Sequence, residues 1–253
     1  MEVLIVDDPG TVVADAIAQH VQPGAVLGLA TGSSPLPVYR ELIDRHTRSE
    51  LSLAGVRAFT LDEYVGLAQS HAESYHSVIR REFTDHIDLD RVDGPDGEAK
   101  DIPAEAARYE AAIVEAGGID VQLLGIGTDG HIGFNEPGSS LMSRTRVKTL
   151  TQQTREDNAR FFDSVDDVPH HVLTQGLGTI LDAGHLVLIA TGSSKANAVA
   201  AAVEGPVAAF CPASVLQLHQ HVTVVVDPPA AAQLRLAAYY RFTAENKPDW
   251  QRF

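Results

Sequence analysis

The sequence predicts an α/β protein with a mainly parallel sheet, built as one domain over residues 1–253. Short apolar runs alternate with segments of helical pattern, which is typical of parallel strands joined by right-handed crossovers. Small-residue loops directly follow two of the apolar runs, where open parallel sheets bind their ligands. No linker-like or low-complexity stretch interrupts this alternation, and the length fits a single α/β domain.

The first third of the chain contains two predicted strand–helix pairs. Residues 3–6 form a short apolar strand, and residues 11–21 have the pattern of an amphipathic helix. Residues 25–30 form a second apolar strand, followed by the loop 31–34. A helix is expected over 35–46, because a proline near a helix start costs no hydrogen bond.

The middle of the chain repeats the pattern. Residues 56–61 are a strand that ends at an Asp-Glu-Tyr sequence, and residues 73–86 are expected to be helical. Residues 88–101 are polar and rich in Gly and Pro, which predicts a loop. A helix over 103–116 leads into the apolar run 119–126, which has the character of a buried strand.

The last third adds two more strands. Residues 174–181 indicate a helix, 185–190 a strand and 194–203 a helix. Residues 222–226 are a last buried strand, and 229–240 are expected to form a closing helix.

Composition restricts the kind of partner. The chain has 19 basic and 34 acidic residues, a net charge of −15, and 44% hydrophobic residues. An acidic protein lacks the basic patches that general nucleic-acid or anionic-membrane surfaces need, so neither partner is expected. A small anionic substrate needs only a local cluster of cations and backbone amides.

Cysteine and hydropathy indicate the compartment. Cys211 is the single cysteine and can form no internal disulfide, so we expect a reducing cytoplasm. The start of the chain lacks the basic residues and long apolar run of a signal peptide. No run approaches the roughly 18 apolar residues of a membrane span.

The stretch 125–137, GIGTDGHIGFNEP, is the most informative part of the sequence. It places Asp129, His131 and Glu136 close together in a glycine-rich loop after a predicted buried strand. An acid, an imidazole and a second acid can transfer protons to and from a substrate. A turn that happens to contain one polar residue is an ordinary alternative for each of them, but a weak one for the set.

The same stretch also matches a dinucleotide-binding pattern, G-x-G-x-x-G. That motif needs a helix opening at its third glycine and an acidic residue about 20 positions later. Here Gly133, Pro137 and Gly138 discourage a helix, and Arg144 and Arg146 lie where the acid would be. We therefore expect no nucleotide cofactor.

Two segments of the chain resemble each other. Residues 29–35 read LATGSSP and residues 189–195 read IATGSSK, each between a strand and a helix. Such loops offer amides, hydroxyls and the positive helix end to an anion, and Lys195 adds a charge suited to phosphate. Helix capping by Ser or Thr explains either loop alone equally well. The pair favours a phosphate site.

Histidines outside the central loop give no metal-binding pattern. His170 and His171 are adjacent, and His219 and His221 are close, but the chain has no H-E-x-x-H motif and no thiol to join Cys211. We expect no metal.

Taken together, the chain resembles the glucosamine-6-phosphate deaminase family, in the family's order and over nearly its whole length. The matching stretches are ATGSSP (30–35), TLDEYVGL (60–67), SYHSVIRREF (74–83), GIGTDGHIGFNEP (125–137), SRTRVKTLT (143–151), ARFFD (159–163), TQGLGTILDA (174–183), GSSKA (192–196) and AAVEGPV (201–207). The resemblance implies a three-layer α/β/α sandwich with a Rossmann-like sheet, and no metal or cofactor. It also implies the conversion of glucosamine 6-phosphate and water to fructose 6-phosphate and ammonia.

The resemblance assigns catalytic roles to four residues. It implies that His131 opens the sugar ring, that Asp129 and Glu136 flank it, and that Asp62 is the general base. From the residues alone, Asp62 could equally be a helix cap or a surface acid. Because neighbours on a strand point to opposite faces, we expect only one of Asp62 and Glu63 to face substrate.

The resemblance also assigns binding residues. It implies that phosphate is bound by Thr31, Gly32, Ser33, Ser34, Arg160 and Lys195. Ser139, Arg146 and Lys148 match an activator site of hexameric members, so it allows allosteric control and a homo-oligomer. Surface bases balancing an acidic protein are an equal alternative for that trio.

Two other functions compete with this one. A 6-phosphogluconolactonase shares the fold and the phosphate loops, but Glu136 and the DEYVGL segment disfavour it. A sugar-phosphate sensor would bind without turnover. Such regulators usually carry a DNA-binding helix-turn-helix, and the chain begins directly with the first strand.

Overall fold

The computed structural model describes residues 1–248 and 250–251, and its centre is a sheet of seven parallel strands. In spatial order the strands are β1 (Glu2–Ile5), β10 (Val222–Val226), β9 (His185–Ala190), β6 (Val121–Leu124), β2 (Val26–Leu29), β3 (Arg57–Thr60) and β5 (Arg91–Asp93). Every residue of β2, β6, β9 and β10 is buried. These strands are apolar throughout because helices cover both faces of a parallel sheet.

Eight α-helices and five short 3₁₀ turns are present in the described residues. They are α1 (Pro9–Ala18), α2 (Leu36–Thr47), α3 (Tyr75–Glu82), α4 (Ile102–Glu115), α5 (Gln152–Asn158), α6 (Leu177–Leu181), α7 (Ala196–Glu204), α8 (Ala237–Glu245), η1 (Thr84–His86), η2 (Ala159–Phe161), η3 (Val165–Asp167), η4 (Ser193–Lys195) and η5 (Pro212–Leu218). Several helices begin where the sequence supplies a cap: Asp8 accepts a hydrogen bond from the Thr11 amide, and Asp101 from the Ala104 amide. No helix in this part of the chain is long and apolar enough to cross a membrane.

The direction of the connections divides the helices between the two faces. The chain moves one way along the sheet through α1, α2 and α3, and the other way through α4, α6 and α7. Right-handed crossovers therefore place the two sets on opposite faces, and α1 indeed packs against α2. The predicted α/β/α arrangement around a mainly parallel sheet is confirmed.

The order of the strands creates a crevice. From β2 the chain continues toward β3, whereas from neighbouring β6 it continues toward β9. Loops leaving two adjacent strands in opposite directions open a gap at their carboxyl ends, the usual ligand site of such sheets. The glycine-rich loop after β6 is thereby bracketed by the two small-residue loops after β2 and β9.

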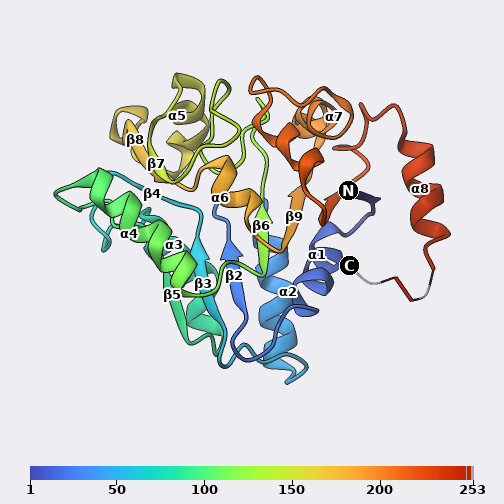
Figure 1. The fold of residues 1–253 in the computed structure, drawn as a ribbon, viewed down its shortest axis with the longest axis horizontal. Helices are drawn as coiled ribbons and strands as arrows, with labels where there is room; N and C mark the ends of the chain where they lie inside the picture. Colours follow the sequence, from blue (N-terminus) through green and yellow to red (C-terminus); the bar gives the residue numbers. More distant parts are fainter. Residues whose placement is uncertain (249, 252–253) are drawn as a thin grey trace.

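A second, antiparallel sheet was not predicted. It consists of β4 (Asp62–Tyr64), β8 (His171–Thr174) and β7 (Arg146–Thr149). Figure 1 shows this sheet and α5 at the top of the view, above the strands of the main sheet. A small core beneath it consists of Tyr64, Phe134, Leu150, Val168 and Val172.

Several predicted boundaries were wrong. The helix expected over 174–181 begins only at Leu177, because Thr174 ends β8. The loop expected over 88–101 contains the edge strand β5, whose polar residues give no strand pattern. Residues 229–236 form turns, and the closing helix is α8, which has no buried residue and packs beside β1. Strands 185–190 and 222–226 were predicted at their observed bounds.

Candidate active site

A cavity of about 470 Å³ lies at the carboxyl ends of β2, β6 and β9. Its lining includes eight of the residues singled out in the sequence: Thr31, Gly32, Ser33, Ser34, Asp62, His131, Arg160 and Lys195. Asp129 and Glu136 contact His131 but do not themselves line the cavity. The fold therefore brings the expected catalytic and phosphate-binding residues around one space.

The imidazole of His131 lies between two carboxylates. Its Nδ1 is 2.7 Å from Asp129 Oδ1 and 3.6 Å from Glu136 Oε2. Burial disfavours the charged form of Asp129, but the His131 side chain and amide outweigh it and hold the pKa of Asp129 well below its usual range. Glu136 is fixed through Oε1, which accepts a hydrogen bond of 2.6 Å from Thr154 at the start of α5. The arrangement can orient the ring and stabilise its protonated form.

Gly127 is what lets His131 take this position. A Cβ at Gly127 would lie 2.2 Å from a ring carbon of His131, so the ring packs directly on the glycine backbone. At Gly127 the backbone therefore approaches the imidazole of His131 closely.

Asp62 is a buried carboxylate facing the cavity. It is only 4% exposed, and Thr174 offers it one long hydrogen bond of 3.5 Å. Burial, reinforced by the charge of Glu63, raises the pKa of Asp62 well above its ordinary value. A carboxylate in this state is a stronger base than one in water, as proton abstraction from carbon requires.

Glu63 points away from the cavity, as strand alternation predicted. Its Oε1 accepts the Tyr75 amide at 3.0 Å and its Oε2 the His76 amide at 2.9 Å. It thereby caps the first turn of α3 and lines a separate, smaller cavity. Two adjacent acids thus have different tasks: Asp62 faces substrate space, and Glu63 holds a helix.

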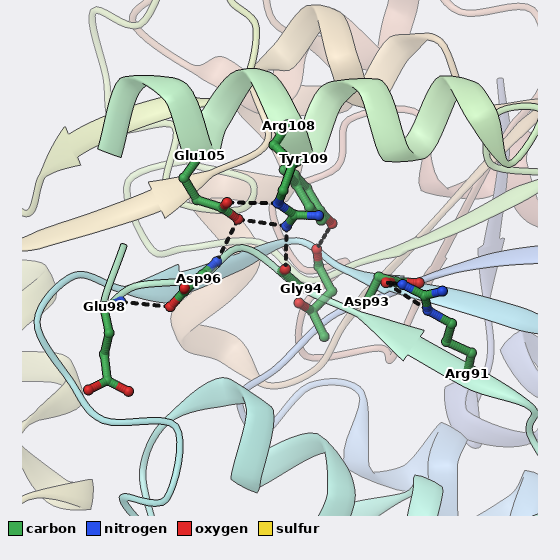
Figure 2. Close-up of polar contacts among 9 residues, drawn as sticks. Arg91, Asp93, Gly94, Asp96, Glu98, Glu105, Arg108 and Tyr109 are labelled. Atoms are coloured by element: carbon green, nitrogen blue, oxygen red, sulfur yellow. Dashed lines mark hydrogen bonds and ion pairs between the residues drawn. The ribbon is translucent and has the colours of Figure 1, made fainter. Parts of the chain in front are cut away.

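A polar network joins α4 to the chain at the ends of β3 and β5, close to Asp62 (Figure 2). Arg108 on α4 pairs with Glu105, which accepts the Asp96 amide at 2.8 Å, and Arg108 also donates to the Gly94 carbonyl. From the same helix the Tyr109 hydroxyl donates to the carbonyl of Thr60, two residues before Asp62. The end of β3 is therefore fastened to α4.

The two small-residue loops have matching shapes. Gly32 and Gly192 both have positive φ, +93° and +86°, a conformation that glycine adopts without strain. In the second loop Asp227, just after β10, accepts the Gly192 amide at 2.9 Å. Burial lowers the pKa of Lys195, and Asp157 opposes that effect. A half-buried lysine beside backbone amides suits a phosphate group.

Arg160 approaches the same end of the cavity from η2. Its guanidinium lies 4.6 Å above the Phe161 ring, which leaves its planar face supported and its edge available to oxygen atoms. Its charge acts on Lys195, so the two cations lie close together. A dianionic phosphate is the kind of ligand that would reduce the repulsion between these two cations.

Some lining residues were not singled out from the sequence. Tyr75 is partly buried in the cavity wall, stacks on Phe134 with ring centroids 6.0 Å apart, and donates to the Tyr64 hydroxyl at 3.3 Å. Asn158 on α5 donates to the same hydroxyl at 3.1 Å. The only signal for Tyr75 was its place in the matching stretch 74–83, because one tyrosine in a charged helix resembles any core residue.

The three residues matched to an activator site lie outside the cavity. Arg146 and Lys148 are two positions apart on β7 and so share a face, while Ser139 is buried and its Oγ has no partner among the described residues. Arg146 donates to Asn135 Oδ1 at 2.8 Å, and burial lowers the pKa of Arg146. The site remains a prediction, now with a physical link to the catalytic loop.

One group of side chains has the spacing of metal ligands. One atom from each of Asp129, His131 and Glu136 lies within 4.8 Å of the other two. No sequence pattern predicted this cluster, because D-x-H-x₄-E is no established metal motif.

Comparison with known proteins identifies related chains. The family described as glucosamine-6-phosphate isomerases/6-phosphogluconolactonase matches residues 6–225. A glucosamine-6-phosphate deaminase of Rhodococcus opacus (strain B4) is 68% identical over the whole of both chains. One from Arthrobacter sp. (strain FB24) is 63% identical over 99% of each.

Two solved structures are similar to this chain over most of its length. A monomeric glucosamine-6-phosphate deaminase is 44% identical, with a TM-score of 0.90 over 92% of this chain and 100% of that one. The 6-phosphogluconolactonase of Trypanosoma cruzi is 22% identical, with a TM-score of 0.71 over 92% and 97% of the two chains. The second likeness shows a shared fold only.

Proposed function

This chain belongs to the family of glucosamine-6-phosphate isomerases and 6-phosphogluconolactonases, and we propose that its cavity performs the deaminase reaction. In that reaction glucosamine 6-phosphate and water become fructose 6-phosphate and ammonia, a step of amino-sugar catabolism. The full-length relatives at 68% and 63% identity are named for this activity. The observation that carries the assignment is that Asp62 on β4 and His131 in the loop after β6 border one cavity with both small-residue loops.

Ring opening is the first task. A proton must leave the O1 hydroxyl and another must reach the ring oxygen, and histidine is the side chain suited to both transfers near neutral pH. His131 lines the cavity and has Asp129 and Glu136 at its Nδ1. The two carboxylates stabilise the imidazolium that forms while the ring oxygen awaits its proton.

Proton transfer between carbons is the second task. Asp62 takes the proton from C2 of the open aldehyde and returns one to C1, which converts the C2 amine into an imine. The buried position of Asp62 strengthens it as a base, and the Gly133 backbone beside its Oδ2 leaves room for substrate. Water then adds to C2, and ammonia leaves.

Phosphate binding holds the sugar in place for both steps. Thr31 to Ser34 border one side of the cavity, and Lys195 with Arg160 border another. Because the phosphate is bound before and after the chemistry, these residues contribute mainly to KM.

The deaminase assignment is favoured over lactone hydrolysis by the full-length relatives at 68% and 63% identity, which are named for the deaminase activity. The lactonases in the comparison are at 16–24% identity, which speaks for the fold alone.

The test is an assay of purified protein with glucosamine 6-phosphate. We expect equal amounts of ammonia and fructose 6-phosphate, and no hydrolysis of 6-phosphogluconolactone. Lactone hydrolysis without ammonia would assign the chain to the other branch of the family. Binding without any turnover would support a sensor.

Activation is a separate part of the proposal. Arg146 and Lys148 offer two cations on one face of β7, and Arg146 contacts the catalytic loop through Asn135. We expect N-acetylglucosamine 6-phosphate to change the rate through this face. A rate unaffected by that compound would remove the site. The solved relative described as monomeric makes the mass in solution the companion measurement.

A further inference from the structure

We propose that Asp129, His131 and Glu136 bind a divalent transition-metal ion, and that the bound ion inhibits the enzyme. One carboxylate oxygen from each acid and one ring nitrogen lie within 4.8 Å of one another. The three side chains come from one loop after β6, so their spacing is set by a short piece of backbone. This site is an addition to the catalytic role of the three residues.

The distances fit an ion with little rearrangement. Zinc binds histidine nitrogen at about 2.0–2.1 Å and carboxylate oxygen at about 2.0–2.2 Å, which places neighbouring ligands roughly 3–3.5 Å apart. His131 Nδ1 is 3.6 Å from Glu136 Oε2 and 2.7 Å from Asp129 Oδ1. Only the Asp129 contact must open, and the Asp129 side chain is partly exposed and can move.

Glu136 supplies the second, independent observation. The residue is 3% exposed, and its Oε2 completes no hydrogen bond within the described residues. Its Oε1, by contrast, is held by Thr154 at 2.6 Å. One oxygen is therefore fixed while the other faces the imidazole without a partner. A buried carboxylate oxygen in this condition is costly, and a cation is one way to satisfy it.

The ligand chemistry selects the kind of ion. One imidazole and two carboxylates suit zinc, cobalt or nickel, whereas magnesium and calcium prefer oxygen ligands alone. Three protein ligands leave at least one position for water. Coordination uses the Nδ1 lone pair, so the ring keeps one hydrogen, on Nε2: the imidazolium releases one proton to the solvent, and the neutral Nδ1–H tautomer shifts its hydrogen to Nε2.

Inhibition follows from where the ion sits, and this consequence rests on the proposed role of His131. With an ion on Nδ1, the neutral ring carries its hydrogen on Nε2, so Nε2 has no lone pair with which to accept a proton. Ring opening depends on that nitrogen, whereas phosphate binding through Lys195 does not. We therefore expect the ion to lower kcat and to leave KM nearly unchanged.

The binding test uses the full chain after treatment with a chelator. Cobalt(II) is titrated with detection of its visible absorption, and zinc(II) by calorimetry. The matched variants are Glu136→Gln and Asp157→Asn, because Asp157 also lies at the cavity but outside the cluster. We expect Glu136→Gln to weaken binding at least about tenfold, the loss that even an outer partner causes, and Asp157→Asn to leave the affinity unchanged.

Two results would overturn the site: no binding at micromolar ion, or equal affinity in Glu136→Gln and the unaltered chain. If Glu136→Gln fails to fold, as judged by its circular dichroism, Asp129→Asn takes its place in the same comparison. The activity arm measures ammonia release before and after zinc. Loss of kcat that a chelator reverses supports inhibition, and an unchanged rate at saturating zinc refutes it. Inactive chelated protein would refute the proposed function instead, while the binding arm still decides the metal site.

Discussion

The two ends of the main sheet both carry buried polar side chains, but they treat them in opposite ways. At the carboxyl end, Asp62 has one long hydrogen bond and Glu136 Oε2 has none among the described residues. At the amino end, His185 Nδ1 lies 3.0 Å from His20 Nε2, and its Nε2 lies 2.9 Å from Thr223 Oγ1. Unsatisfied groups mark the end where substrate is expected, and satisfied ones mark the end that serves stability.

This contrast predicts that substitutions at one end of the sheet affect activity and that substitutions at the other end affect stability. Changes at the carboxyl end should remove activity at little cost in folding, because those groups lack good partners in the free protein. Changes at the amino end should alter folding and leave chemistry intact.

Asp62→Asn should have the largest effect on activity. We expect kcat to fall by about 10³–10⁴, the upper part of the range for loss of a general base. Stability should stay the same or rise, because burial disfavours the native carboxylate. Steady-state kinetics and urea unfolding at neutral pH measure the two quantities.

Glu63→Ala is the matched control on the neighbouring residue. It removes the acceptor of the Tyr75 and His76 amides, so stability should fall by about 1–3 kcal/mol while kcat of the folded enzyme changes little. If Glu63→Ala lost activity as severely as Asp62→Asn, the assignment of different faces to the two acids would be wrong.

His131→Gln should slow ring opening. We expect kcat on the cyclic sugar to fall by about 10², the lower part of the range, because sugars also open in water without help. Thermal stability should change little, since the ring rests on Gly127 and its contact with Asp129 Oδ1 is partly exposed. Turnover at the normal rate would exclude His131 from the reaction.

Lys195→Ala should act mainly on binding. Loss of a charge-assisted contact costs about 1.5–3 kcal/mol, so KM should rise about 10- to 100-fold with a smaller change in kcat. Lys100→Ala is the control, because Lys100 is exposed and does not line the cavity. It should leave kcat and KM unchanged. An unaltered KM in Lys195→Ala would place the phosphate elsewhere.

At the amino end, pH should change stability. Burial, followed by the charge of His20, lowers the pKa of His185 to about 4, and burial also lowers the pKa of His20. The cations His221, His219 and Lys247 act on His185 in the same direction. Below the ordinary pKa of about 6.5 the unfolded chain binds more protons than the folded one.

Stability should therefore be full above about pH 6.5, decrease as pH falls, and level off near pH 4, with a total loss on the order of 3 kcal/mol. Urea unfolding across this range measures it. His185→Gln should flatten the dependence without reducing kcat at neutral pH. A curve of the same slope in that variant would show that other groups cause the loss.

Much of the site could be predicted from the sequence because its parts are local. The loop 125–137 contains the imidazole and both flanking acids, and two similar loops contain the small residues and Lys195. The opposite facing of Asp62 and Glu63 followed from strand alternation alone. Tyr75 and Asn158 escaped notice because their place in the cavity wall depends on contacts with Tyr64, far away in the chain.

The sequence by itself determined where the buried strands lie and which loops carry chemistry, since apolar runs and glycine-rich turns depend on a few neighbouring residues. Tertiary structure alone decided that β6 lies between β9 and β2, so that the 125–137 loop has one of the two small-residue loops on each side. It also decided the pairing of β4, β7 and β8, whose polar residues form strands only because they meet one another. Strand order and pairing are set by the packing of distant segments, which no local pattern records.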